Sequence, residues 1–152
     1  QTKPEILAQF YPLTDYMITD IKNMDTEVHK KWSGVGNEQI LANIEQTVKA
    51  GVNLTIRIPI IPGVNDSEEN IHATGQFIRD RLNNRVSQVQ LLTYLKMGTE
   101  KYESLGLDYP MGADYQPPAR EEREPWIAHL AEILRSYGIN AVAGATTKAK
   151  AP

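Results

Sequence analysis

Charged side chains occupy two segments of the sequence that otherwise predict buried strands. Residues 16–22 are rich in β-branched and aromatic side chains, and strand alternation places Asp20 and Lys22 on one face near the carboxyl end. Residues 53–61 form a run of mostly Leu and Ile that is interrupted by Arg57 and stops at a Pro-Gly pair. In parallel sheets, ligands bind beyond the carboxyl ends of the strands.

These charges admit two interpretations, because a buried charge is costly unless it is paired. In the first, Asp20, Lys22 and Arg57 line a polar interior that receives an anionic or zwitterionic ligand. In the second, Asp20 forms an internal salt bridge with Arg57 or Lys22 that only orders the core. The residue pattern supports the two equally.

Strands alternate with helices along the chain. Short helices are predicted over 5–10 and 25–32, and apolar residues four apart predict a longer helix over 37–51, capped by Asn37. Asp66 and Glu69 have the spacing of a capping box, which predicts that the next helix begins at Asp66. Further strands are predicted over 87–94 and 139–142, on either side of a helix over 121–137. This order predicts βαβ units and a parallel sheet with right-handed crossovers.

Other residues that could carry chemistry give weaker signals. Residues 34–36 (Gly-Val-Gly) lack the lysine and the glycine spacing of a phosphate loop, which predicts a turn. Trp32 and Trp126 are interpreted as packing anchors. Residues 96–118 are rich in Gly, Pro and Tyr and predict a long ordered loop with a functional role. Three histidines lie on separate helical segments without metal-ligand spacing, so none is expected to bind a metal: His29, His72 and His129.

Composition excludes several classes of function. The 152 residues fit one domain over 1–152, and the formal net charge of −3 comes with scattered basic residues, which argues against a nucleic-acid or membrane-surface partner. The longest apolar stretch, 58–62, is far shorter than the roughly 20 residues that cross a bilayer, so we expect a cytoplasmic protein. Cysteine is absent, which excludes thiolate catalysis and a thiolate-bound metal centre within this chain. Because the chain opens on Gln1 rather than methionine, we expect a piece of a longer protein.

Three motifs follow one another along the chain. The first reads D-I-K-N-M-D from Asp20, followed by His29 and by W-S-G-V-x-N from Trp32. The second reads R-I-P-I-I-P-G-V-N-D from Arg57, and the third reads L-L-T-Y from Leu91 and continues as G-x-x-K-Y-x-x-L-G. In this order and at these intervals, they resemble the motifs of glycyl-radical-enzyme activating enzymes of the pyruvate formate-lyase activating type, in the radical S-adenosylmethionine superfamily. The resemblance covers residues 13–138.

The resemblance implies parallel βα units that form the C-terminal half of a partial TIM-type (β/α)6 radical SAM barrel. For the full-length parent it implies S-adenosylmethionine and a four-iron four-sulfur cluster, a glycyl radical enzyme such as pyruvate formate-lyase as partner, and an electron donor of the flavodoxin or ferredoxin class. Such enzymes cleave the sulfonium reductively, and the 5′-deoxyadenosyl radical then abstracts hydrogen from a glycine of the partner. Asp20 and Lys22 are implied around the methionyl carboxylate and a nearby cation, and Arg57 in hydrogen bonding to the same ligand.

Two departures from the family pattern limit this transfer. Leu95 stands where the family commonly has histidine and Thr93 where it has proline, so the histidine's contact with the adenosine side is lost or is replaced by Gln90 or Tyr94. The C-x-x-x-C-x-x-C loop and the Gly-Gly-Glu motif that precede these segments in the family are missing. The fragment itself is therefore expected to be inactive, and no catalytic or metal-binding residue is expected within it.

Two alternatives to an activating-enzyme fragment remain open from the sequence. One is a naturally short, cluster-free module that binds S-adenosylmethionine or a glycyl radical enzyme. The other is a radical S-adenosylmethionine enzyme that acts on a small molecule or peptide, with residues 96–118 shaping its pocket. In the fragment account, the inner face of the sheet and the edge of its first strand lack cover, which predicts self-association.

Overall fold

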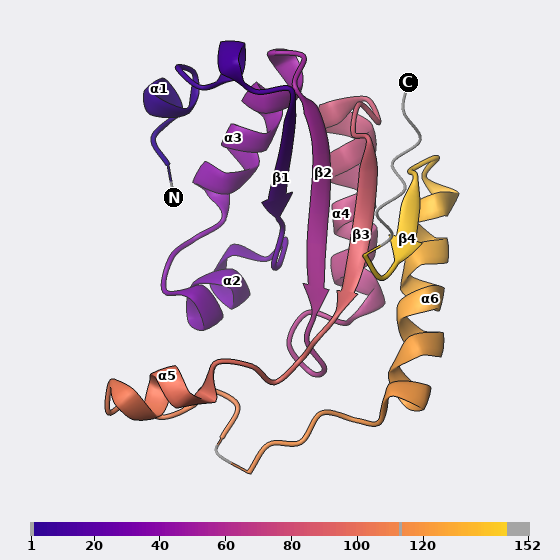
Figure 1. Cartoon of the computed structure of the whole chain (residues 1–152). Coiled ribbons are helices and arrows are strands. Elements are labelled where there is room, and N and C mark those ends of the chain that lie inside the picture. The colour runs from indigo at the N-terminus through magenta and orange to yellow at the C-terminus, as the bar shows by residue number, and fades with distance from the viewer. Residues whose placement is uncertain (1, 113, 146–152) are drawn as a thin grey trace.

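The computed structural model describes residues 2–112 and 114–145 and shows an α/β fold (Figure 1). The strands are β1 (Tyr16–Asp20), β2 (Asn53–Ile60), β3 (Gln88–Thr93) and β4 (Ala141–Ala143). The helices are α1 (Pro4–Leu7), α2 (Thr26–Ser33), α3 (Glu38–Lys49), α4 (Glu68–Leu82), α5 (Thr99–Ser104) and α6 (Arg120–Ser136), with a 3₁₀ turn at Tyr11–Leu13.

The strands form a fully parallel sheet whose order is β1-β2-β3-β4. The predicted α/β class and parallel sheet are confirmed, with strand ends that differ by one or two residues from the prediction. Within the two described ranges, no helix combines the length and apolar character needed to cross a membrane.

The core lies between one face of the sheet and the helices that join its strands. Strand alternation turns Leu54, Ile56 and Ile58 of β2 toward this face, where each is at most 1% exposed. Side chains of α3, α4 and α6 complete the same apolar cluster, among them Ile44, Ile78 and Leu130. The opposite face of the sheet carries no helix among the described residues (Figure 1).

The start of α4 corrects one prediction. The helix begins after Ser67, whose hydroxyl accepts a hydrogen bond from the Asn70 amide at 3.3 Å, and not at Asp66. Asp66 instead accepts from the Gly63 amide at 2.9 Å, because its carboxylate closes the turn that follows β2. Gly63 has a φ of +73°, a conformation that glycine adopts without a steric penalty.

Two further predictions need refinement. Asn37 is the N-cap residue of α3, as predicted, but its side chain makes no capping hydrogen bond and instead donates to the carbonyls of Asn23 and Met24, in the segment before α2. Trp32 and Trp126 are not core anchors, because they are 40% and 39% exposed. The turn predicted over 34–36 is confirmed, since Gly34 ends α2 in the left-handed conformation with a φ of +81°.

Candidate functional site

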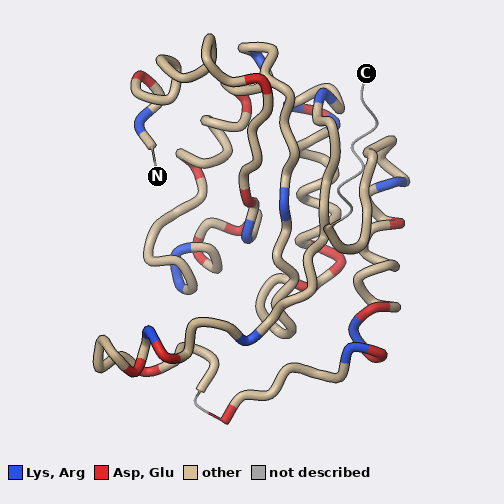
Figure 2. The backbone as a smooth tube through the Cα atoms, viewed as in Figure 1, with Lys and Arg blue, Asp and Glu red and all other residues tan. Residues whose placement is uncertain are grey.

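A row of side chains crosses the open face of the sheet. Strand register pairs Asp20 of β1 with Arg57 of β2, Arg57 with Gln90 of β3, and Gln90 with Val142 of β4. Residues directly opposite one another in neighbouring strands project to the same side of a sheet. Figure 2 shows the basic segment midway along β2 and the acidic segment at the end of β1. The two charges that the sequence placed inside predicted strands therefore share one face.

Arg57 is held by a buried amide. Its Nε donates to Oε1 of Gln90 at 3.2 Å, and Nε2 of Gln90 donates to Oε1 of Gln88 at 2.8 Å. Gln90 and Gln88 are only 7% and 5% exposed, whereas Arg57 is half-buried. Among the described residues, the terminal Nη nitrogens of Arg57 make no hydrogen bond or ion pair, so these donors remain available to a ligand on the open face.

Asp20 pairs with Lys22 rather than with Arg57. Nζ of Lys22 lies 3.0 Å from Oδ2 of Asp20, and the two side chains are 50% and 44% exposed. An ion pair at this exposure contributes little to stability. In the described part of the chain, Asp20 and Arg57 form no salt bridge. The salt bridge that Asp20 does form, with Lys22, faces solvent and does not order the core.

Asn65 fixes the backbone beside Lys22. Its amide donates to the carbonyl oxygens of Lys22 at 2.7 Å and Pro59 at 2.8 Å, and its Oδ1 accepts from the Ile61 amide at 2.7 Å. Asn65 is 2% exposed, so these contacts are shielded from water. The side chain thereby joins the carboxyl ends of β1 and β2.

Further asparagines connect the beginnings of α3 and α4 to the same junction. Asn70 accepts from the Met24 amide at 2.9 Å and donates to the Asn65 carbonyl at 2.9 Å. Asn37 donates to the carbonyls of Asn23 and Met24 at 3.0 and 2.8 Å. The segment that carries Lys22 is consequently held by side-chain hydrogen bonds from Asn37, Asn65 and Asn70. Asn65 and Asn70 were not among the residues predicted from the sequence, and Asn37 was predicted only as a helix cap, although the presence of Asn37 and Asn65 in the first two motifs was a signal.

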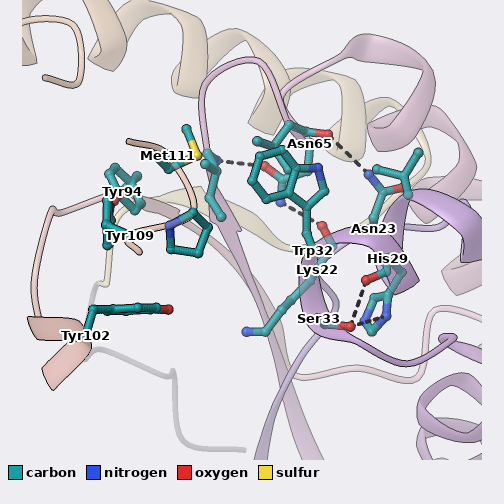
Figure 3. Close-up of a pocket in the computed structure, with 14 residues that line it drawn as sticks. Lys22, Asn23, His29, Trp32, Ser33, Asn65, Tyr94, Tyr102, Tyr109 and Met111 are labelled. Atoms are coloured by element: carbon teal, nitrogen blue, oxygen red, sulfur yellow. Dashed lines mark hydrogen bonds between the residues drawn. The ribbon is translucent and has the colours of Figure 1, made fainter. Parts of the chain in front are cut away.

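A pocket of about 190 Å³ lies beyond the carboxyl ends of β1, β2 and β3 (Figure 3). Its walls come from α2 and from the predicted loop, which contains α5. Figure 3 shows Lys22 extending from beneath Trp32 toward the side where Tyr102 and Tyr109 lie. Most of the lining is aromatic or aliphatic, with Lys22 as its cationic residue among the described residues. The full lining is Lys22, Asn23, Val28, His29, Trp32, Ser33, Ile61, Val64, Asn65, Tyr94, Tyr102, Tyr109, Pro110 and Met111.

Tyrosines hold the loop against the sheet. The hydroxyls of Tyr94 and Tyr109 are hydrogen bonded, and the rings of Tyr102 and Tyr109 meet edge to face with centroids 5.2 Å apart. Nζ of Lys96 donates to the Tyr115 carbonyl at 3.0 Å. These contacts join separate parts of this long connection, and the connection contains a short helix, α5.

Comparison with known proteins agrees with the motifs. No protein-family model matches the sequence. The chain is 40% identical over 137 residues to the (2S)-3-sulfopropanediol dehydratase activating enzyme of Klebsiella oxytoca, a match that covers 90% of this chain and 43% of that enzyme. It is 29% identical over 133 residues to the pyruvate formate-lyase 1-activating enzyme of Escherichia coli, covering 88% of this chain and 51% of that enzyme.

The chain is a homologue of glycyl-radical-enzyme activating enzymes. A crystal structure of a domain of the pyruvate-formate lyase-activating enzyme from Bacteroides vulgatus matches with a TM-score of 0.70 and 27% identity, covering 94% of this chain and 75% of that domain. The resemblance inferred from the three motifs is therefore confirmed. The chain spans about half the length of the curated activating enzymes that it matches.

The residues of this activating-enzyme homologue do not fit an iron–sulfur cluster. The chain contains no cysteine, and in the ranges 2–112 and 114–145 no three His, Asp or Glu side chains gather as a metal site would require. Each histidine has another contact: Nδ1 of His29 lies 2.7 Å from the Val35 carbonyl, His72 contacts Tyr137, and His129 contacts Glu68.

Leu95 occupies the position at which a histidine was expected from the motif. Leu95 is 60% exposed and points no polar group toward the open face. Of the two predicted replacements, Tyr94 lies in the aromatic pocket and Gln90 lies on the sheet beside Arg57. Gln90 is thus near the predicted ligand-binding charges, while Tyr94 belongs to the loop that closes the pocket.

Proposed function

We propose that this chain is the C-terminal half of the barrel of a radical S-adenosylmethionine activating enzyme. The observation that carries the proposal is the row of Asp20, Arg57 and Gln90 on a sheet face that the connecting helices leave open. Homology to activating enzymes supports it. The intact parent cleaves S-adenosylmethionine reductively and abstracts hydrogen from a glycine of a partner enzyme.

The three charged residues suit the amino-acid end of S-adenosylmethionine. The terminal nitrogens of Arg57 and the ammonium of Lys22 can donate to its carboxylate, and charge-assisted bonds of this kind are stronger than neutral ones. The carboxylate of Asp20 can balance the ligand ammonium or a cation beside it. Asp20, Lys22 and Arg57 are thus proposed to bind and orient the ligand, and no chemical step is assigned to them.

The rest of the parent is proposed to supply what this chain lacks. Residues 1–152 form one portion of a partial (β/α)6 barrel, and a preceding portion holds the four-iron four-sulfur cluster. The isolated chain is then inactive, and its uncovered sheet face and β1 edge favour self-association. The proposed setting is the cytoplasm, with a glycyl radical enzyme such as pyruvate formate-lyase as partner and a flavodoxin or ferredoxin as electron donor.

Calorimetric titration of the 152-residue chain with S-adenosylmethionine tests the ligand site. We expect weak binding that disappears when Asp20 and Arg57 are both replaced by alanine. A matched control replaces Arg79 and Asp80, an exposed ion pair on α4, by alanine, and should bind as the original does. Equal binding by both double variants would contradict the proposed site.

A second experiment tests the reaction itself. The full-length parent, reduced and supplied with S-adenosylmethionine, is incubated with candidate glycyl radical enzymes, and the glycyl radical is sought by electron paramagnetic resonance. A radical signal with one partner supports the proposal. No signal with any partner would favour a radical enzyme that acts on a small molecule or peptide.

A further inference from the structure

Gln90 occupies a position where its amide can set the direction of Arg57. Gln90 lies directly opposite Arg57 in the strand register, and only 7% of its surface is exposed. Its Oε1 accepts the Nε–H of Arg57 at 3.2 Å. A hydrogen bond to Nε restrains rotation of the guanidinium, and the outer edge of the group, formed by the two terminal amino groups, keeps N–H donors that Gln90 does not engage.

Gln88 in turn fixes the orientation of the Gln90 amide. Residues two apart in a strand project to the same face, and Oε1 of Gln88 accepts from Nε2 of Gln90 at 2.8 Å. Because the guanidinium of Arg57 can only donate, Oε1 of Gln90 faces it, and Nε2 of Gln90 donates to Gln88 on the other side. The two buried amides therefore form a directed chain that ends at the guanidinium.

The side chain at position 90 is a neutral amide, which leaves the positive charge of Arg57 in place. An amide oxygen accepts from Arg57 without neutralising it, whereas a carboxylate would form an ion pair and compete with any anionic ligand. Asp20, the residue opposite Arg57 on the other side, pairs with Lys22. Within the described residues, Arg57 is consequently a positioned cation that no protein carboxylate neutralises.

We infer that Gln90, supported by Gln88, is a positioning residue that aims the terminal nitrogens of Arg57 at a carboxylate on the open face. The inference deepens the proposed function and rests on it, because the carboxylate is that of S-adenosylmethionine. Gln90 acts through Arg57 and need not touch the ligand. Replacing it should therefore affect ligands that carry the amino-acid group and spare those that lack it.

The hydrogen bond can be tested without any ligand. The Nε–H signal of Arg57 in a proton–nitrogen spectrum is assigned by its loss in Arg57→Lys. We expect the Nε–H proton to exchange slowly with solvent in the original chain. In Gln90→Met, which preserves the side-chain length but removes the acceptor, it should exchange rapidly. Gln76→Met, at an exposed position on α4, is the matched control and should leave the signal unchanged.

The consequence for binding is tested with two ligands. S-adenosylmethionine carries the carboxylate, and 5′-methylthioadenosine lacks the whole amino-acid group. Both Gln90→Met and Gln90→Glu should weaken binding of the first by about tenfold or more and leave that of the second unchanged. Gln90→Glu should show the larger loss, because its carboxylate neutralises Arg57. A purely structural defect would weaken both ligands alike.

The outcomes separate the inference from the proposed function. An Arg57 signal that is unaffected by Gln90→Met overturns the inference. The inference is also overturned if Arg57→Ala lowers the affinity for S-adenosylmethionine while both Gln90 variants leave this affinity unchanged. If the original chain binds no S-adenosylmethionine while its Arg57 signal is protected, the proposed ligand site is overturned, and the ligand part of the inference falls with it.

Discussion

The two faces of β2 differ in what their side chains contact. On the covered face, Leu54, Ile56 and Ile58 belong to the buried apolar cluster and are shielded from water. On the open face, Thr55 and Arg57 bind polar partners from the adjacent strands. A single strand thus contributes alternately to the core and to the candidate site. Substitutions at neighbouring positions of β2 should therefore affect separate properties: stability on the covered face and ligand binding on the open face.

The largest expected effect is on the covered face. Ile56→Ala should lower the free energy of unfolding by about 2–5 kcal/mol, because it removes buried methyl groups and leaves a cavity. Urea denaturation followed by circular dichroism measures the change. Ile18→Ala on the open face of β1, where the side chain is 46% exposed, is the control and should cost less than about 1 kcal/mol. Equal losses of unfolding free energy in the two variants would show that the covered face does not contribute more to stability than the open face.

The junction between the strand ends should give the next largest effect. Asn65→Ala leaves the carbonyls of Lys22 and Pro59 without their buried partner, and we expect a loss of about 2–3 kcal/mol. Thermal unfolding measures it. Asn53→Ala removes one exposed hydrogen bond to the Asp15 carbonyl and should cost less than about 1 kcal/mol. A loss in Asn65→Ala no greater than in this control would show that the junction is not anchored by Asn65.

A smaller effect is expected within the open face itself. The Tyr16 hydroxyl is hydrogen bonded to Thr55, which is 1% exposed, and Tyr16→Phe should cost about 1 kcal/mol. Urea denaturation again measures the loss. Tyr102→Phe is the control, since its hydroxyl has no hydrogen bond among the described residues. If both variants unfold alike, polar pairing does not stabilise this face.

The smallest effect concerns a carboxylate remote from both faces. The hydroxyl of Thr26 donates to Glu38 at 2.5 Å and, as the main cause, holds the pKa of Glu38 below its ordinary value of 4.5. A lowered folded-state pKa stabilises the fold above the ordinary value, and this contribution is lost as pH falls through the folded-state value. Thr26→Val should raise the pKa of Glu38 toward 4.5 in a carboxyl NMR titration. An unchanged pKa would refute the assigned cause.

The sequence predicted local features better than contacts between distant segments. Alternation alone placed Arg57 opposite the aliphatic face of its strand, because side-chain direction in a strand depends on position parity. The partner of Arg57 could not be predicted in this way, since it requires the register between β2 and β3. The Asn65 contacts were missed for the same reason, because Lys22 lies 43 residues earlier in the chain.

Helix boundaries show a similar limit. Asp66 and Ser67 are both good capping residues, and the sequence does not decide between them. The structure selects Ser67 because Asp66 is already used to close the turn after β2. The tryptophans were interpreted as packing anchors, whereas Trp126 is 39% exposed and its indole donates to the Asp66 carbonyl at 2.9 Å.

The strand order has a consequence for synthesis. Because β1, β2, β3 and β4 lie side by side in chain order, each strand that leaves the ribosome pairs with the one made just before it. No pairing in such a sheet spans an intervening strand, so the sheet grows in one direction without rearranging earlier pairs. Because β1 lies at one edge of the sheet, any strand made before it could join the sheet only at that edge or at the opposite edge, beside β4.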